Sequence, residues 1–370
     1  MTGLATPAPE PPEPANTPAS KTSRTSPAPR TPRTPMSPRT GDGLTATRHH
    51  LRWLLRLHRP ALYVWAVLVT LLALALLWLW GPLTDAAAAG WRQYDACRDG
   101  GPCLYDQDAI LRFKDVYTYT NIPLNALPFL VAAWSGAALV GRETESGTAR
   151  LAWTQGMSPL RWLTVKLAVP AVLVTAGTSL LVLLHRLAWS ASQGRIDTAK
   201  TWYDNPTLHA NSPLTVALAL AGLAAGALAG LLLRRTLPAL LLGLGVTAAL
   251  RVLSDLAMPH LWPAVTRVTS RNDGYLYDGV QVDAGLVTST GAHIADPGCG
   301  PSYVDGCADV YDRLDVTGFY VTFHPESHYW PLQLTTTALV LTVAAALTLA
   351  AFLLLRRSTA TPRARREAAV

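Results

Sequence analysis

Six apolar runs, each about as long as a helix that crosses a bilayer, constrain this sequence more than any other feature. They occupy residues 61–81, 122–140, 164–187, 213–233, 237–257 and 332–355. A helix crosses the hydrocarbon core with roughly 20 residues, because each residue adds about 1.5 Å along the axis. The fourth and fifth runs are separated only by residues 234–236, so they form an antiparallel hairpin. The sequence therefore predicts an all-α integral membrane protein with six transmembrane helices.

The composition agrees with a membrane protein. Hydrophobic residues make up 50% of the 370 residues and charged residues only 15%, which is less charge than a soluble domain of this size usually carries. The net charge of +7 alone is compatible with nucleic-acid binding. However, the basic residues cluster at the ends of the apolar runs and in the N-terminal tail, where they set topology and attract anionic lipid. We therefore expect a lipid membrane as a partner and no nucleic acid.

The charge of the connecting segments predicts the orientation of the chain. If there are six spans, the basic segments all fall on one side: residues 48–59, the loop 141–166, Arg234/Arg235 and the tail 356–370. The loops on the other side are acidic on balance. Because positive charge marks the cytoplasmic side, we expect a multi-pass plasma-membrane protein with both termini in the cytoplasm.

Two segments precede the first apolar run. Residues 1–46 are rich in Pro, Thr, Ser and Ala and nearly lack large apolar residues. Such a segment cannot bury enough surface to offset the entropy of ordering, so we predict a disordered cytoplasmic tail. Residues 47–60 include RHHLRWLLRLHR, in which basic and apolar residues alternate at helical spacing. This pattern predicts an amphipathic helix that lies at the cytoplasmic membrane interface.

The outer loop, residues 258–331, is too long to be a simple connector. Its middle, residues 274–294, alternates polar and apolar residues, which predicts a small β-hairpin. We expect this loop to cover the outer mouth of the membrane part.

The four cysteines fall in two close pairs, Cys97/Cys103 and Cys299/Cys307. Both pairs lie on the predicted outer side, where disulfides are stable. A zinc site of four cysteines is the alternative, but these spacings differ from the usual zinc-ribbon pattern. We therefore predict two disulfides and no metal site.

The segment between the second and third runs, GRETESGTARLAWTQGMSPLRWLTVK, is polar and charged. It spans residues 141–166. Ser158-Pro159 predicts the start of a helix, because serine caps free N–H groups and proline fits the first turn. A plain intracellular turn is one interpretation of this segment. Its residue pattern favours a specialised contact.

No catalytic motif is present. The sequence has no G-x-x-x-x-G-K-[ST] phosphate loop, so the chain does not hydrolyse ATP alone, and it has no H-E-x-x-H or G-x-S-x-G motif. His293, His324 and His328 of the outer loop lack metal-ligand spacing, and we expect an ordinary surface role for each. We predict no enzyme activity, no cofactor and no metal in this chain.

Two features inside the apolar runs are candidates for packing or transport. Gly222, Gly226 and Gly230 recur every four residues, which permits close helix packing against another span or against a second copy of the protein. Arg251 and Asp255 lie four residues apart and can pair on one helix face. The pair lines a translocation path or is an interfacial pair that reaches toward water, and the sequence leaves both open.

The chain resembles the permease subunits of type-2 ABC exporters, especially actinobacterial ones. Three segments carry the resemblance: Gly141–Thr148 (GRETESGT) with the LAWTQ and Arg161…Lys166 that follow, Leu231–Gly243 (LLLRRTLPALLLG), and His324–Leu334 (HPESHYWPLQL). With the six-span layout, the similarity covers about residues 48–357. The long N-terminal tail departs from the family.

The resemblance implies a permease without a nucleotide site, two copies of which assemble with two separate ATP-binding subunits that bind ATP and Mg²⁺. It also implies that the loop between the second and third spans touches the ATPase. By matching position, the residues of this coupling element are Arg142, Glu143, Glu145, Gly147, Thr148, Arg161 and Lys166. Export rather than import rests on the resemblance. The few charges inside the spans suit a hydrophobic or amphipathic substrate.

Two other functions are weighed against an exporter permease. A membrane-anchored sensor or assembly factor, whose outer loop binds a ligand or an envelope protein, explains the large loop 258–331 but leaves the charged segment 141–166 unexplained. An intramembrane enzyme needs paired polar residues at membrane depth, and apart from Arg251/Asp255 the spans offer almost none. The exporter permease is the leading hypothesis.

Overall fold

A computed structural model describes residues 59–97, 104–154, 157–298 and 307–367, with residues 360–367 described by their backbone alone. The predicted disordered tail and most of the predicted amphipathic helix 47–60 lie outside the described residues. Cys103 and Cys299 lie outside them as well.

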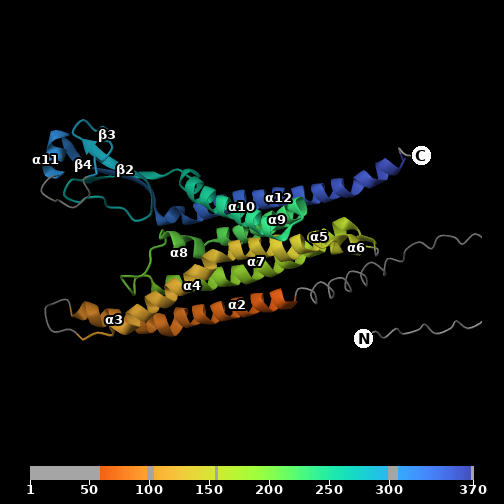
Figure 1. The fold of residues 1–370 in the computed structure, drawn as a ribbon. Coiled ribbons are helices and arrows are strands. Elements are labelled where there is room, and N and C mark those ends of the chain that lie inside the picture. The colour runs from red at the N-terminus through yellow and green to blue at the C-terminus, as the bar shows by residue number, and fades with distance from the viewer. Residues whose placement is uncertain (1–58, 98–103, 155–156, 299–306, 368–370) are drawn as a thin grey trace, which may run out of the picture. The chain divides into compact units, whose positions relative to one another are not determined.

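The described part of the chain contains six helical segments that are long and apolar enough to cross a membrane, which confirms the predicted number (Figure 1). They are Arg59–Ala96, Gln107–Glu145, Pro159–Ser192, Pro213–Leu233, Thr236–His260 and Glu326–Thr359. The first and second segments extend far beyond the apolar runs. The first passes Pro82 through a π-helical turn, η1 (Leu79–Leu83), which accommodates the residue that lacks an N–H donor.

The helical elements have the following bounds. The first segment consists of α2 (Arg59–Trp78), η1 and α3 (Thr84–Ala96), and the second of α4 (Gln107–Trp134), η2 (Ser135–Gly141) and α5 (Arg142–Glu145). Then come α6 (Thr148–Thr154), α7 (Pro159–Ser192), α8 (Asn205–Ala210), α9 (Pro213–Leu233), α10 (Thr236–Ala257) and η3 (Met258–His260). The last span contains η4 (Glu326–His328) and α12 (Tyr329–Glu367).

Helix α9 lies among the other membrane helices. It packs against α4, η2, α7, α10 and α12, and 15 of its 21 residues are buried. Alanine and glycine dominate its sequence, and such small residues let neighbouring backbones approach closely.

The segment 258–331, predicted to be an outer loop, contains a four-stranded antiparallel sheet, so the prediction of an all-α protein is wrong in this region. The strands are β1 (Val265–Ser270), β2 (Val280–Thr288), β3 (His293–Ile294) and β4 (Val316–His324), in the order β1-β4-β2-β3. The predicted hairpin is confirmed, because β2 and β3 pair with Leu286 opposite Ile294. The predicted alternation identified β2 and β3, whereas β4 adds VTGFYVTFH, a run of β-branched and aromatic residues that favours a strand.

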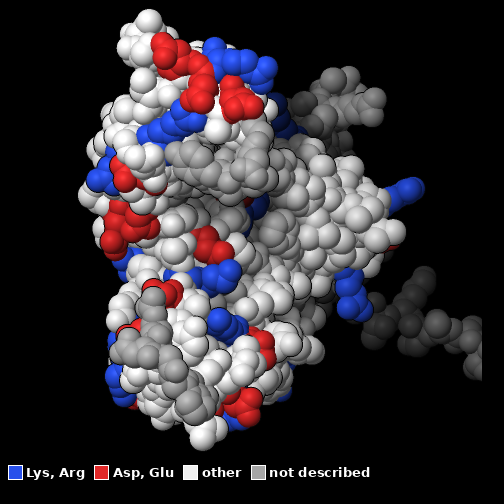
Figure 2. All heavy atoms as spheres, turned by 90° about the vertical axis from the view of Figure 1, so that its left-hand side faces the viewer, with Lys and Arg blue, Asp and Glu red and all other residues white. Residues whose placement is uncertain are grey.

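The sheet has a small core of its own. Leu286, Val316 and Phe319 are buried against Tyr311 of α11 (Cys307–Arg313). We call the end of the membrane helices that carries the sheet the sheet end; α5 and α6 lie at the opposite end (Figure 1). Figure 2 looks onto the sheet end, where acidic and basic side chains gather in groups while the right-hand flank is largely uncharged.

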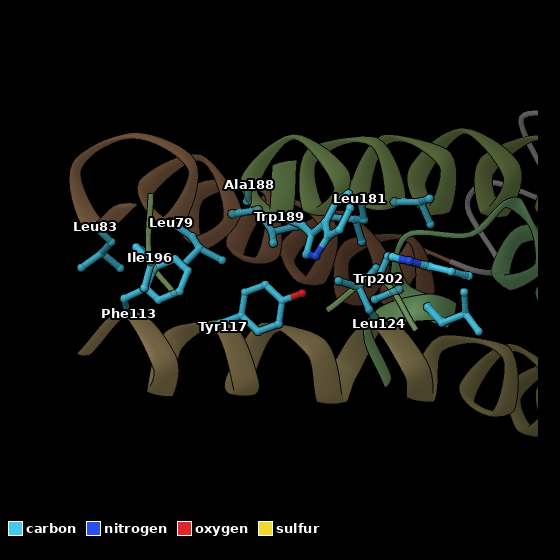
Figure 3. Close-up of a cluster of buried hydrophobic side chains, with 14 of the residues drawn as sticks. Leu79, Leu83, Phe113, Tyr117, Leu124, Leu181, Ala188, Trp189, Ile196 and Trp202 are labelled. Atoms are coloured by element: carbon cyan, nitrogen blue, oxygen red, sulfur yellow. The ribbon is translucent and has the colours of Figure 1, made fainter. Parts of the chain in front are cut away.

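Below the sheet, the membrane helices share an aromatic and aliphatic core. Leu79, Tyr117, Leu181 and Trp189 point toward one another from η1, α4 and α7, and Trp202 closes this cluster (Figure 3). Burial of such side chains is worth roughly 1.5–3 kcal/mol each when the reference is water. This core fixes the positions of α4 and α7 at the sheet end.

The two predicted disulfides have different outcomes. The structure contains Cys307 as a free, half-buried cysteine, so the predicted Cys299–Cys307 bond is not supported. Cys307 begins α11 and packs against the core of the sheet, which gives the thiol a structural place without a bond. The Cys97/Cys103 pair stays a prediction, since Cys103 lies outside the described residues.

Candidate functional site

The segment 141–166 is helical for most of its described length, rather than an open loop. The helix η2 runs without a break into α5, and the chain then turns sharply at Gly147, whose φ of +73° strongly favours glycine. Helix α6 follows, and α7 begins at Pro159. The Ser158 hydroxyl accepts a hydrogen bond from Arg161 N at 3.3 Å, which confirms the predicted helix start. We call α5, the turn at Gly147 and α6 the elbow.

A buried ion pair fastens the elbow to α7. Lys166 Nζ lies 2.5 Å from Glu143 Oε1 and donates a further hydrogen bond to Leu139 O at 2.9 Å. The indole N–H of Trp162 donates to Glu143 Oε2 at 3.3 Å. Lys166 is only 1% exposed, so it does not face water as a cytoplasmic loop residue would. Glu143 and Lys166 therefore form a buried intramolecular ion pair.

Two further contacts tie the elbow to α9 and α10. Thr144 Oγ1 donates to Gly230 O at 3.1 Å. Glu145 accepts from Thr236 N at 2.8 Å and also from the Thr236 hydroxyl, so its carboxylate caps the N-terminus of α10, where negative charge is favourable. Three of the four residues of α5 are thus connected to three membrane helices.

The elbow also presents side chains that the protein does not bury. Arg142, Thr148 and Arg150 are exposed, and Leu151 is 59% exposed. Arg161, at the start of α7, is half-buried. A pocket of about 100 Å³ lies beside α6; its lining includes Trp153, Arg150, Arg234 and Leu355. Exposed charge next to exposed leucine is a combination found in protein–protein contacts.

The glycine stripe of α9 has its partner within the chain. A Cβ placed on Gly222 would lie 2.7 Å from Pro128 O of α4, and one on Gly230 would lie 2.9 Å from Gly141 N. Gly226 faces the backbone of Ala132 and Gly136. The sequence left open whether these glycines pack against a span or a second copy, and in the structure they pack against α4 and η2.

Arg251 and Asp255 belong to a larger polar cluster at the sheet end. Arg251 Nε lies 3.2 Å from Asp255 Oδ2, and its terminal nitrogens donate to Asn125 and Asn205, each at 3.3 Å. Asp255 Oδ1 lies 2.7 Å from His209 Nε2. The side chain of His209, on α8, is 1% exposed, and this burial lowers its pKa. The cluster joins α10 to α4 and α8.

The comparison with protein families decides the class of the protein. A family model described as ABC-2 membrane transporter related matches residues 66–258, more than half of the chain. The chain belongs to this family. It is a multi-pass membrane permease of a class that in general pairs with an ATP-binding subunit. No curated protein and no solved structure matches the chain.

The family match covers the elements that form the candidate site of this permease. It begins in α2 and ends at Met258, so it includes the elbow, the glycine stripe and the Arg251 cluster. It stops before β1, and the sheet is therefore an addition to the matched region.

Sequence reasoning missed three partners of Arg251 and Asp255 in this permease: Asn125, Asn205 and His209. Asn125 is a polar residue inside an apolar run, which is a usable signal for a buried contact. Asn205 and His209 lie in a polar segment between spans and give no comparable signal. Among the described residues, no group of three or more His, Cys, Asp or Glu side chains has the geometry of a metal site.

Proposed function

We propose that this protein is the membrane subunit of an ATP-driven exporter that moves a hydrophobic or amphipathic molecule across the plasma membrane. A separate ATP-binding subunit supplies the energy and binds ATP and Mg²⁺. By analogy with the family, two permease subunits and two ATP-binding subunits form the transporter. The observation that carries this proposal is the elbow, a short helical element fastened to three membrane helices.

The elbow has the mechanical properties that coupling requires. A force on α6 reaches α7 through Glu143 and Lys166, α9 through Thr144, and α10 through Glu145. Because a buried ion pair and hydrogen bonds hold these positions, the helices respond as connected bodies rather than through a slack loop. Closure of a partner ATPase against the elbow would therefore shift several spans together.

The exposed residues of the elbow form the proposed contact with the ATPase. Arg142, Thr148 and Arg150 supply polar and charged groups, and Leu151 supplies apolar area. Glu143 and Lys166 do not contact the ATPase in this proposal, since their side chains pair with each other. Their contribution is to hold the elbow against α7. The sequence has no phosphate loop of its own, which fits a motor on another subunit.

An apolar pocket supports a hydrophobic or amphipathic cargo. The pocket has a volume of about 290 Å³ and lies between α2, α4 and α7. Its lining contains Trp65, Leu68, Trp134, Val174 and other apolar side chains, and none of the described lining residues is charged. The volume is near the lower end of the range of small-molecule sites, roughly 300–1,000 Å³.

Co-purification with an ATP-binding subunit tests the proposal. The permease is co-expressed with the ATP-binding subunit encoded nearest to it, and Leu151→Asp is compared with Leu104→Asp. Leu104 is 97% exposed but lies just before α4, at the sheet end. We expect Leu151→Asp to reduce recovery of the ATPase about tenfold or more, because a charge would replace buried apolar contact, and Leu104→Asp to leave it unchanged. Equal recovery with both variants would rule out α6 as the contact.

A sensor or assembly factor is the second candidate, and the four-stranded sheet is the observation that favours it. The sheet has its own core and an exposed surface, which suits the binding of an envelope protein or another ligand. Purification from native membranes discriminates the two functions. Recovery of an envelope protein without any ATP-binding subunit would favour the sensor or assembly factor.

A further inference from the structure

Three lysine or arginine side chains lie inside the six apolar runs: Lys166, Arg186 and Arg251. Lys166 is paired with Glu143 and Arg251 with Asp255. Arg186 forms no ion pair with any acidic side chain in the part of the chain that the structure describes. Charged residues in membrane spans are costly and usually have a partner. Arg186 therefore differs from the other two in having no acidic partner among the described residues.

Two aromatic rings hold the Arg186 side chain in place. Its guanidinium carbon lies 4.7 Å from the centre of the Tyr329 ring and 4.6 Å from the centre of the Trp330 ring. These rings are nearly perpendicular, at 83°, so they form a corner around the guanidinium. Tyr329 is itself fixed, because its hydroxyl donates to Asn211 O at 2.8 Å. The guanidinium is thus positioned by the fold.

The two rings do not neutralise the charge. Cation–π contacts stabilise a guanidinium by about 0.5–2 kcal/mol, but the face of a ring does not supply the anionic acceptor that the N–H groups favour. Arg186 Nη1 is buried and has no hydrogen-bond partner among the described residues, which is costly. The natural complement of a planar guanidinium is an oxyanion, above all a phosphate or a carboxylate.

The surroundings of Arg186 indicate how such an anion arrives. Arg186 lies six residues before the end of α7 at Ser192, about 9 Å from the sheet end of that helix. Leu183 and Ser190 flank it on the same helix face, and both are exposed. Trp330 is 49% exposed. The face is therefore open at the membrane boundary, with an apolar residue on one side of the arginine and a polar residue on the other.

We propose that Arg186, with Tyr329 and Trp330, binds the phosphate headgroup of an amphiphile in the membrane leaflet at the sheet end. The phosphate meets the guanidinium near Ser190, and the apolar tail runs along Leu183. A phospholipid of the bilayer and a transported phosphate-bearing amphiphile share this chemistry. The site does not depend on the exporter function, because binding requires only this chain.

Native mass spectrometry of the full chain in detergent tests the site, with phosphatidylglycerol as the probe. We expect Arg186→Gln to weaken binding of one phosphatidylglycerol about tenfold or more, because a charge-assisted contact is lost. Arg112→Gln is the matched control, since Arg112 is an exposed arginine on α4 outside the corner, and we expect unchanged binding. Equal phosphatidylglycerol binding by the wild type and Arg186→Gln would overturn the proposal and leave Arg186 as an interfacial anchor.

Two further probes separate the sources of the phosphate. Inorganic phosphate has the head without the tail, and dodecyl phosphate has a single chain. We expect dodecyl phosphate to compete with phosphatidylglycerol and inorganic phosphate to compete at least tenfold more weakly. If dodecyl phosphate displaced phosphatidylglycerol when present at a much lower concentration than the lipid, a single-chain amphiphile would be the preferred ligand. Equal competition by inorganic phosphate would overturn the amphiphile site.

Milder variants keep the test valid if Arg186→Gln fails to fold. Arg186→Lys retains the charge but loses the planar fork, and Trp330→Leu removes one wall of the corner while leaving the charge in place. We expect each to reduce, by at least half, the increase in Tm that phosphatidylglycerol produces in the wild type. If phosphatidylglycerol raised the Tm of both variants as much as it raises the Tm of the wild type, the proposed corner would be contradicted.

Discussion

At the scale of single residues, Lys166 and Glu143 show how a charged pair becomes part of the interior. The lysine is 1% exposed and the glutamate 12%, and Leu139 O and Trp162 Nε1 satisfy further hydrogen-bonding groups of the pair. A buried pair of this kind is not a strong source of net stability, because desolvation offsets the attraction. Removing only one partner strongly destabilises the protein, because the remaining charge stays buried without a counter-charge.

Glu143→Ala is therefore expected to destabilise the protein by about 3–5 kcal/mol, since it leaves Lys166 without a counter-charge. The measurement is thermal unfolding of the purified protein in detergent. Glu145→Ala is the matched control. Glu145 is exposed and caps α10, so its loss should lower the Tm less than the loss of Glu143 does. A smaller decrease in Tm for Glu143→Ala than for Glu145→Ala would contradict the buried-pair interpretation.

His209 predicts a dependence of stability on pH. Burial lowers its folded-state pKa below the value of about 6.5 expected in the unfolded chain. Because the unfolded chain then binds the proton more readily, this contribution is complete above about pH 6.5 and is lost as the pH falls below it. We expect His209→Asn to reduce the loss of Tm between pH 7.5 and pH 5. His260→Asn, on the exposed end of η3, is the control, and an unchanged slope in His209→Asn would contradict the assignment.

At the scale of elements, the small residues of α9 determine how closely the membrane helices pack. Gly222, Gly226 and Gly230 admit the backbones of α4 and η2, and Gly243 of α10 approaches Gly226 from another side. In lipid, such contacts depend on van der Waals packing rather than on the hydrophobic effect, so a single methyl group matters. By contrast, a Cβ placed on Gly245 of α10 would meet no atom of a neighbouring element within 4 Å.

Gly226→Ala and Gly245→Ala make a matched pair of variants. A Cβ on Gly226 would lie 2.5 Å from Ala132 O, so we expect destabilisation of at least about 1–3 kcal/mol. Gly245→Ala should be neutral or stabilising by up to about 1 kcal/mol, because alanine is the better helix former. The Tm of each variant checks this, and equal effects at the two sites would show that α9 packs less closely than described.

At the scale of the whole molecule, the two ends of the membrane helices differ in kind. The sheet lies at one end and the elbow at the other (Figure 1). The rule of positive charge predicts that the elbow end faces the cytoplasm. The proposed contact with an ATPase depends on that orientation.

Cysteine labelling in intact cells tests the orientation. In a background with the four native cysteines replaced, Leu104→Cys and Leu151→Cys place thiols at opposite ends, each on a residue more than half exposed. We expect a membrane-impermeant maleimide to label Leu104→Cys in intact cells and Leu151→Cys only after permeabilisation. Labelling of Leu151→Cys from outside would place α6 beyond the reach of a cytoplasmic motor and would contradict the proposed coupling.

Much of the fold was predictable, because the membrane imposes a single period and a fixed length. The six spans, the helix start at Ser158 and the β2–β3 hairpin all follow from local patterns, and the structure confirms them. The rest of the sheet was not predicted, because β1 and β4 pair across more than 40 intervening residues. Pairing at that distance leaves no periodic signal that a reader of the sequence can follow.

The charged pairs of the candidate site were predicted only in part. The pairing of Arg251 with Asp255 was predicted, because charge inside an apolar run is conspicuous, and the structure confirms it. Glu143 and Lys166 were named only by the family resemblance, as contacts of an ATPase, and their pairing with each other was not predicted.

The sequence by itself determined how often the chain crosses the membrane and where its charges lie, since lipid accepts only helices of sufficient length and apolarity. Only the tertiary structure decided which charges neutralise one another, which backbone the glycines admit, and which arginine of the membrane spans has no acidic partner among the described residues. Those outcomes depend on distances between residues far apart in the chain, and the folded packing alone sets such distances.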